Sequence, residues 1–189
     1  MALILTFVFH LIIRNNLIDN LPELFRSRFA LYKEFDWSKR FFKNYFIIIL
    51  SILAGAASHL FWDAFTHSTG YFVNIIPILN NNFFIWDKEL KVFNVLQHAS
   101  SLIGMVAILW VIWKLPREKT EKTSKFQYWL VVFIVFSLTL LFRFLSGINF
   151  SEYGNIIVSI IAAGMLSLIV AGITQNVLVN LSFPHSDKL

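Results

Sequence analysis

The sequence predicts an all-α protein, a bundle of membrane-spanning helices with four full spans and a partial first one. Hydrophobic residues make up 57% of the 189 residues and charged residues only 14%, which leaves too little polar surface to cover a soluble globule. The mean hydropathy is +0.67. Basic residues gather in short segments between apolar windows, a pattern typical of membrane topology rather than of nucleic-acid binding.

The apolar windows predict the spans, because a helix needs about 20 apolar residues to cross a bilayer, or fewer where flanking side chains reach the interface. Four windows meet this requirement: 45–62, 99–113, 128–145 and 155–175. The first window, 2–13, is too short and lacks the charged start of a signal peptide. We therefore expect a partial span at 2–13, and one domain over 1–189.

The distribution of positive charge predicts the orientation in the cell membrane. Segments 14–44 and 114–126 hold twelve of the sixteen Lys and Arg residues, so both are expected on the cytoplasmic side. Segment 63–98 carries only Lys88 and Lys91 and is expected outside, as is the segment between the last two spans, which has no basic residue. The chain has no cysteine, which excludes disulfides and thiolate metal sites.

The segment 71–86 is apolar but is interrupted by Pro77 and three asparagines. We interpret it as a loop or short helix at the outer interface, anchored by Tyr71 and Trp86. The outer loop 71–94 is expected to fold over the polar residues that precede it, because this would bury its aromatic side chains.

Polar residues at the end of the second window form the strongest candidate site. The stretch SHLFWDAFTHSTG, residues 58–70, places His59, Asp63 and His67 at four-residue intervals. His59 and Asp63 lie on one helix face and can hold one metal ion. His67 lies about 12 Å from His59 along a continuous helix, so it joins such a site only if the helix ends near Thr66.

His98 is the fourth candidate ligand, since it opens the third span at the membrane face where the second span ends. A plainer interpretation is that His59 and Asp63 hydrogen-bond to each other and to Gln97 or Ser101, which would fix a helix pair. Both interpretations stay open. His10, on the first window, is expected to be a packed or interfacial residue.

Arg143, near the outward end of the fourth span, is a candidate catalytic residue beside Asp63. It could neutralise an anionic substrate, or simply extend to the outer headgroups. The cofactor expected for the His59, Asp63, His67 and His98 set is a divalent metal ion such as zinc, with no other cofactor.

Three stretches together resemble a known family: GAASHLFWDAFTHSTG, LQHASSLIG and FHLIIRNNLIDNLP, at 55–70, 96–104 and 9–22. They are similar to the bacterial integral membrane proteins of domain-of-unknown-function family 4184. The resemblance covers most of the chain and implies a multi-spanning helical fold. Members of that family open with a further segment that carries a His and an acidic residue, so the resemblance also implies an amino-terminally shortened form here.

A second likeness rests on the spacing of His59, Asp63, Thr66 and Gly70, which is similar to a pattern in membrane-bound metal-dependent hydrolases. By analogy it implies a metal site. Two interpretations of function follow. In the first, the chain is a membrane-embedded metal-dependent hydrolase whose substrate is a lipid or its headgroup. In the second, it is a non-enzymatic transporter subunit or assembly factor with a structural His/Asp network. The lipid bilayer is the expected partner, and no nucleic acid is expected.

Overall fold

A computed structural model describes residues 2–85, 88–120, 126–147 and 153–182. The chain divides into two compact units. The terminal unit comprises 1–38 and 116–189, and the central unit comprises 39–115. Each unit is described by itself.

The terminal unit opens with a helical run over 2–20. It consists of α1 (Ala2–Val8), a π-helical turn η1 (Phe9–Ile13) and α2 (Arg14–Asn20). Leu21 has an extended backbone and Pro22 follows it, so the run ends there. The short helix α3 (Glu23–Phe29) and the 3₁₀ turn η2 (Ala30–Glu34) complete this part.

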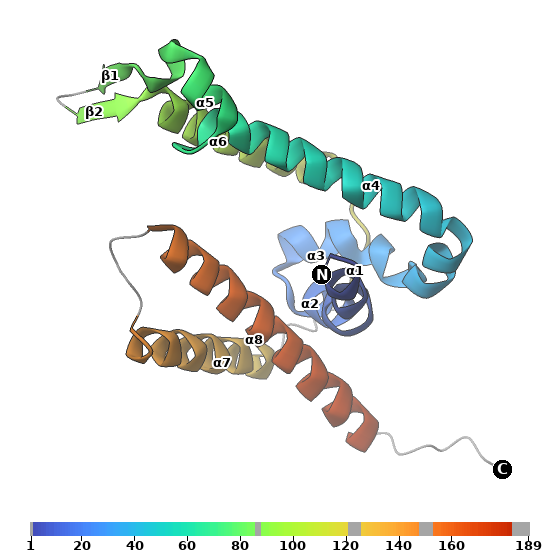
Figure 1. Cartoon of the computed structure of the whole chain (residues 1–189). Helices are drawn as coiled ribbons and strands as arrows, with labels where there is room; N and C mark the ends of the chain where they lie inside the picture. The colour runs from blue at the N-terminus through green and yellow to red at the C-terminus, as the bar shows by residue number, and fades with distance from the viewer. Residues whose placement is uncertain (1, 86–87, 121–125, 148–152, 183–189) are drawn as a thin grey trace. The chain divides into compact units, whose positions relative to one another are not determined.

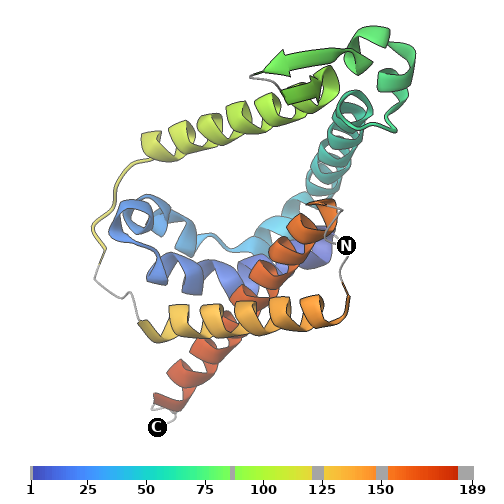
Figure 2. The same ribbon diagram turned by 90° about the vertical axis from the view of Figure 1, so that its left-hand side faces the viewer.

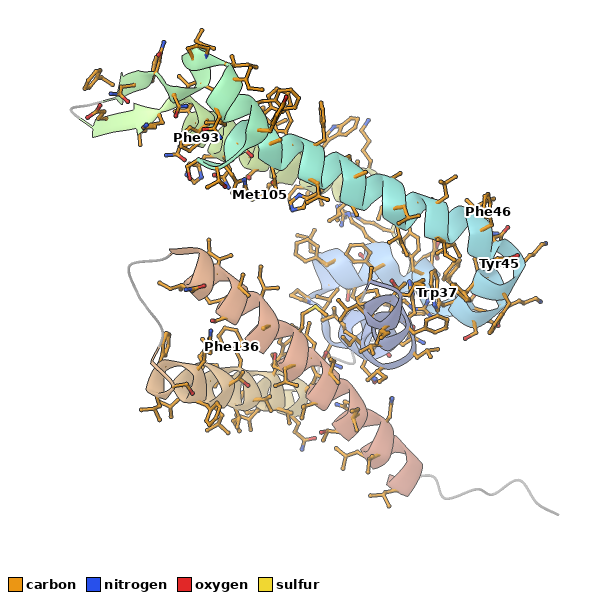
Figure 3. All side chains as sticks on the ribbon, viewed as in Figure 1. Trp37, Tyr45, Phe46, Phe93, Met105 and Phe136 are labelled. Carbon is orange, nitrogen blue, oxygen red and sulfur yellow. The ribbon has the colours of Figure 1, made fainter. Side chains whose placement is uncertain are left out.

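Arg14 joins these elements from the middle of the helical run. Its guanidinium donates hydrogen bonds to the carbonyl oxygens of Phe35 at 2.7 Å and Lys33 at 3.2 Å, and it lies 3.1 Å from Nδ1 of His10. The His10 ring stacks on Trp37 with centroids 4.5 Å apart. Figure 3 shows Trp37 beside the first helices. His10 is therefore a packed residue, as its sequence position predicts.

Helices α7 (Phe126–Leu145) and α8 (Tyr153–Ser182) form the rest of the terminal unit and lie against one another (Figures 1 and 2). On α8, small residues line the contact face, since Ala163, Ser167 and Ala171 are almost fully buried. The turn η1 and the helix α2 also contact α8. Asn16 of α2 donates to the Gly172 carbonyl at 3.2 Å and to Asn176 Oδ1 at 3.0 Å. The first helical run and α8 are thus one packed group.

The central unit is a pair of long helices, α4 (Trp37–Thr66, beginning at the end of the terminal unit) and α6 (Val92–Lys114). The backbone of α4 is kinked at Asn44. Between the helices lie α5 (Tyr71–Ile75), the turn η3 (Pro77–Asn80) and an antiparallel hairpin of β1 (Asn82–Ile85) and β2 (Lys88–Lys91). Helices α4 and α6 converge at the end that carries α5 and the hairpin, and diverge away from it (Figure 2).

A small apolar core fixes the converging end of the central unit. Val73, Leu79 and Phe93 are buried there. The aromatic rings of Phe65 and Phe72 stack with centroids 4.1 Å apart. Figure 3 shows Phe93 at this end, below α5 and the hairpin. The core ties the last turn of α4 to the first turn of α6.

Within the described residues, five helices are long and apolar enough to span a membrane. They are 2–20, 37–75, 92–114, 126–145 and 154–178. This confirms the predicted class of all-α, multi-spanning bundle and indicates a membrane-spanning protein. The structure corrects two details. The first helix runs to Asn20 instead of ending near residue 13, and the outer loop contains a β-hairpin besides a short helix.

Candidate functional site

The candidate site lies at the end of α4, where the helix stops and a tight turn follows. The helix ends at Thr66, and the His67 amide still donates to the Asp63 carbonyl at 3.0 Å. The Gly70 amide then donates to the His67 carbonyl at 2.8 Å. This turn keeps His67 one helical turn after Asp63, and the helix end near Thr66, which the sequence left as one alternative, is present in the structure.

Glycine is required at position 70 because the turn folds back closely on the helix. A Cβ at Gly70 would lie 2.5 Å from the Ala64 carbonyl oxygen and 2.9 Å from that of His67. Real Cβ atoms essentially never come within 3.0 Å of other heavy atoms, and backbone carbonyls at a helix end have little room to move. Gly70 is therefore part of what positions His67.

The Asp63 carboxylate lies between two imidazole rings. His59 Nε2 is 3.4 Å from Asp63 Oδ2, and His67 Nδ1 is 3.6 Å from Asp63 Oδ1. The side chain of Asp63 is 32% exposed, whereas those of His59 and His67 are 76% and 51% exposed. We call this set the His-Asp-His group. Each histidine faces a different carboxylate oxygen, so the single side chain of Asp63 contacts both histidines.

The distance from each histidine nitrogen to the nearer Asp63 oxygen is one that two ligands of a single metal ion could have. Two ligands bound at about 2.0 to 2.2 Å in tetrahedral geometry lie roughly 3.4 Å apart, which is close to both measured distances. Among the described residues, however, no group of three or more His, Cys, Asp or Glu side chains could hold an ion. The described residues therefore bring two histidines to Asp63 but do not form a complete set of metal ligands.

His98 is the predicted ligand that the structure leaves apart from this group. It lies on α6, and its side chain is exposed. Where the structure describes the chain, no ion pair joins His98 to Asp63. The contact between the helices is instead a hydrogen bond from Trp62 Nε1 to Ser100 Oγ at 3.1 Å. The role of His98 as a ligand stays a prediction.

Sequence reasoning missed the hydrogen bond between Trp62 and Ser100. Its only sequence signal is the small residue at position 100, which allows close helix approach. Trp62 directly precedes Asp63, so this bond holds the turn of α4 that bears the carboxylate. Ser100 in turn donates to the Gln97 carbonyl at 3.0 Å, and Ser101 does the same at 2.9 Å.

The outer loop packs beside the His-Asp-His group without covering it. Phe72 contacts the Phe61 and Phe65 rings of α4, with centroids 5.8 and 4.1 Å away. Thr66 is only 1% exposed. The two histidines stay open, as their exposed fractions show, so the loop buries its aromatic side chains but leaves access to Asp63.

Arg143 lies in the terminal unit, near the end of α7. Its Nε donates to Ser159 Oγ of α8 at 3.4 Å, and the residue is exposed. This contact pairs α7 with α8. The predicted catalytic role of Arg143 beside Asp63 stays a prediction, because the two residues belong to different units.

An exposed polar group on a span has a physical consequence. Charged side chains are costly in lipid, so intramembrane His and Asp residues face protein, water or a bound ligand. The His-Asp-His group lies at the end of a helix that is long and apolar enough to span a membrane, and its two histidines are exposed.

Comparison with known proteins identifies the family but no activity. A family model described as Domain of unknown function (DUF4184) matches residues 1–179, so the chain belongs to that family. No curated protein and no solved structure matches the chain.

Proposed function

We propose that this member of the DUF4184 family is a membrane-embedded metal-dependent hydrolase that acts on a lipid headgroup ester. One observation carries the proposal, the Asp63 carboxylate between two imidazole nitrogens at 3.4 and 3.6 Å on an exposed face of a spanning helix. Carboxylate and imidazole are ligands that suit zinc and similar divalent ions.

Each residue of the group has a definite part in this proposal. Asp63 and His59 would bind the ion, because their donor atoms have the spacing of co-ligands. His67 would orient Asp63 from the side of its other carboxylate oxygen, 3.6 Å from His67 Nδ1, as groups behind metal ligands do. A bound divalent ion would lower the pKa of a coordinated water and so supply a nucleophile at neutral pH.

The remaining ligands would come from residues outside the His-Asp-His group. His98 is the first candidate, because it lies near the converging end of α4 and α6. A guanidinium matches phosphate oxygens in pairs, so Arg143 stays a candidate for binding an anionic substrate. The open histidines leave room for a headgroup at Asp63.

Hydrolysis of short-chain phospholipids by the purified full chain tests the proposal. With dihexanoyl phosphatidylglycerol as substrate, we expect turnover that EDTA abolishes and added Zn²⁺ or Mn²⁺ restores. Asp63→Asn should lower the rate by about 100-fold or more, since even groups that only support ligands contribute 10- to 100-fold. Asp36→Asn, an exposed aspartate of the terminal unit, is the matched control and should keep full activity. Turnover that persists in EDTA or in Asp63→Asn would refute the proposal.

A second candidate is a non-enzymatic membrane protein in which the His-Asp-His group is a structural network. It is favoured because no three His, Cys, Asp or Glu side chains among the described residues are placed to hold one ion, and because two imidazoles can satisfy one carboxylate without an ion. In that case the purified protein would hydrolyse none of the lipids, and Asp63→Asn would lower its thermal stability with or without EDTA.

A further inference from the structure

A basic cleft lies in the terminal unit, far along the chain from the His-Asp-His group. It has a volume of about 470 Å³. Two separate segments form its walls, α3 and the residues that follow α6. The lining residues are Glu23, Leu24, Ser27, Arg28, Arg117, Glu118 and Lys119.

The two walls are joined by specific hydrogen bonds. The Glu118 amide donates to the Ser27 carbonyl at 2.8 Å, and Arg26 Nε donates to Thr120 Oγ1 at 3.1 Å. Thr120 in turn donates to Glu23 Oε1 at 3.1 Å. These hydrogen bonds connect the two walls and fix their positions around the cleft.

The charged side chains that line the cleft include more cations than anions. Arg28, Arg117 and Lys119 line it together with Glu23 and Glu118. Glu23 also forms an ion pair with Arg26, whose side chain takes part in the framework and is 4% exposed. The lining residues therefore carry one net positive charge.

Arg28 is the buried member of the cation set. The residue is 2% exposed, and its guanidinium donates to the Leu24 carbonyl at 2.6 Å. Burial, and then the nearby Arg117 guanidinium, lower the pKa of Arg28. Arg28 and Arg117 line the same cleft, so an anion bound there would interact favourably with both guanidinium groups.

We infer that the basic cleft binds a phosphate group, from either an anionic phospholipid headgroup or a soluble phosphate. Arginine guanidinium groups bind phosphate oxygens through paired, charge-assisted hydrogen bonds, and Ser27 and the lysine add donors. The walls begin directly after two spanning helices, 2–20 and 92–114, which is the level where headgroups lie. Leu24, 44% exposed, gives the cleft an apolar side that suits the glycerol part of a lipid.

Calorimetric titration of the purified full chain in a neutral detergent tests this inference with three probes. The probes are dihexanoyl phosphatidylglycerol, the zwitterionic dihexanoyl phosphatidylcholine, and inorganic phosphate. We expect phosphatidylglycerol to bind more tightly than phosphatidylcholine. Arg117→Gln should weaken that binding by about tenfold, the lower limit for losing a hydrogen bond to a charged group. Binding of phosphatidylglycerol alone identifies a lipid headgroup as the ligand, and comparable binding of inorganic phosphate identifies a soluble ligand.

The variants are chosen so that folding does not decide the result. Arg117 and Lys119 are exposed, so Arg117→Gln and Lys119→Gln should fold normally, whereas Arg28→Gln removes a buried group. Arg40→Gln, an exposed arginine outside the cleft, is the matched control and should bind as the wild type does. The inference is overturned if no probe binds, or if Arg117→Gln and Lys119→Gln both bind as Arg40→Gln does.

Discussion

Asp63 contacts two histidines because its carboxylate has two oxygens, and each oxygen lies near a different imidazole ring. His59 and His67 lie about two helical turns apart, roughly 12 Å along the axis, too far to share one ion directly. Each nevertheless lies within 3.6 Å of Asp63. The i, i+4 spacing in both directions therefore builds the group around the aspartate, and the group depends on this residue more than on either histidine.

The sequence could predict the contact of His59 with Asp63 because it is local. An i, i+4 pair on one helix brings side chains together whatever surrounds them, whereas the contact of His67 with Asp63 depends on how the chain turns after α4 ends at Thr66. The bond between Trp62 and Ser100 and the place of His98 could not be predicted in the same way, because they depend on how α4 and α6 approach each other. Spacing along the chain places residues at a membrane level, but it does not fix the rotation of a helix about its axis.

The tight turn at Gly70 leaves no room for a larger side chain at this position. Gly70→Ala should destabilise the converging end of the central unit by about 1 to 3 kcal/mol, the usual cost of forcing extra volume into a packed place. The reason is the 2.5 Å approach of a Cβ to the Ala64 carbonyl. Thermal unfolding in detergent should show a lower melting temperature for this variant. Gly55→Ala is the control, since its Cβ meets no atom within 4 Å; equal stability of the two variants would contradict the account.

Among the helices, the first helical run is longer than the apolar window that predicts it, since it covers 2–20 and the window covers 2–13. Arg14, Asn15 and Asn16 interrupt hydrophobicity, so composition predicts an end near residue 13. In the structure the run continues, because these polar groups have partners: Arg14 binds the Phe35 and Lys33 carbonyls, and Asn16 binds α8. Polar residues that pair across elements lengthen a helix that hydropathy alone would stop.

The first helical run and α8 pack closely where Gly172 meets Ile12. Gly172→Ala would place a Cβ 2.6 Å from the Ile12 carbonyl oxygen, so the two helices would have to separate. We expect a loss of about 1 to 3 kcal/mol, visible as a lower melting temperature. Gly164→Ala on the same helix meets nothing within 4 Å and should be neutral or slightly stabilising, since alanine favours helix. A Gly172→Ala protein as stable as Gly164→Ala would show that this contact is absent.

At the scale of the whole molecule, the number and class of helices could be predicted because apolar length decides them. The hairpin of β1 and β2 could not, since its strands are short and the first begins at the last of three asparagines, which suggest only a loop. The composition of the chain thus determines how many helices it can place in a membrane. The arrangement of short elements between them depends on packing against Phe65, Val73 and Phe93.

Orientation in the membrane stays a prediction and has a direct test. The positive-inside rule places the segment of Lys119 in the cytoplasm and the outer loop of Asn81 outside. Since the chain has no native cysteine, Asn81→Cys and Lys119→Cys give single labelling sites at exposed positions. We expect a membrane-impermeant maleimide to label intact cells only through Asn81→Cys. Labelling of Lys119→Cys instead would reverse the orientation.

The metal content of the purified protein tests the central claim, that Asp63 is the centre of a divalent metal site. Elemental analysis by mass spectrometry would compare the wild type with Asp63→Asn and with the control Asp36→Asn. We expect the wild type and Asp36→Asn to retain a stoichiometric divalent ion after dialysis, and Asp63→Asn to lose it. A wild type without metal after exposure to Zn²⁺, or an Asp63→Asn protein that retains it, would contradict the account.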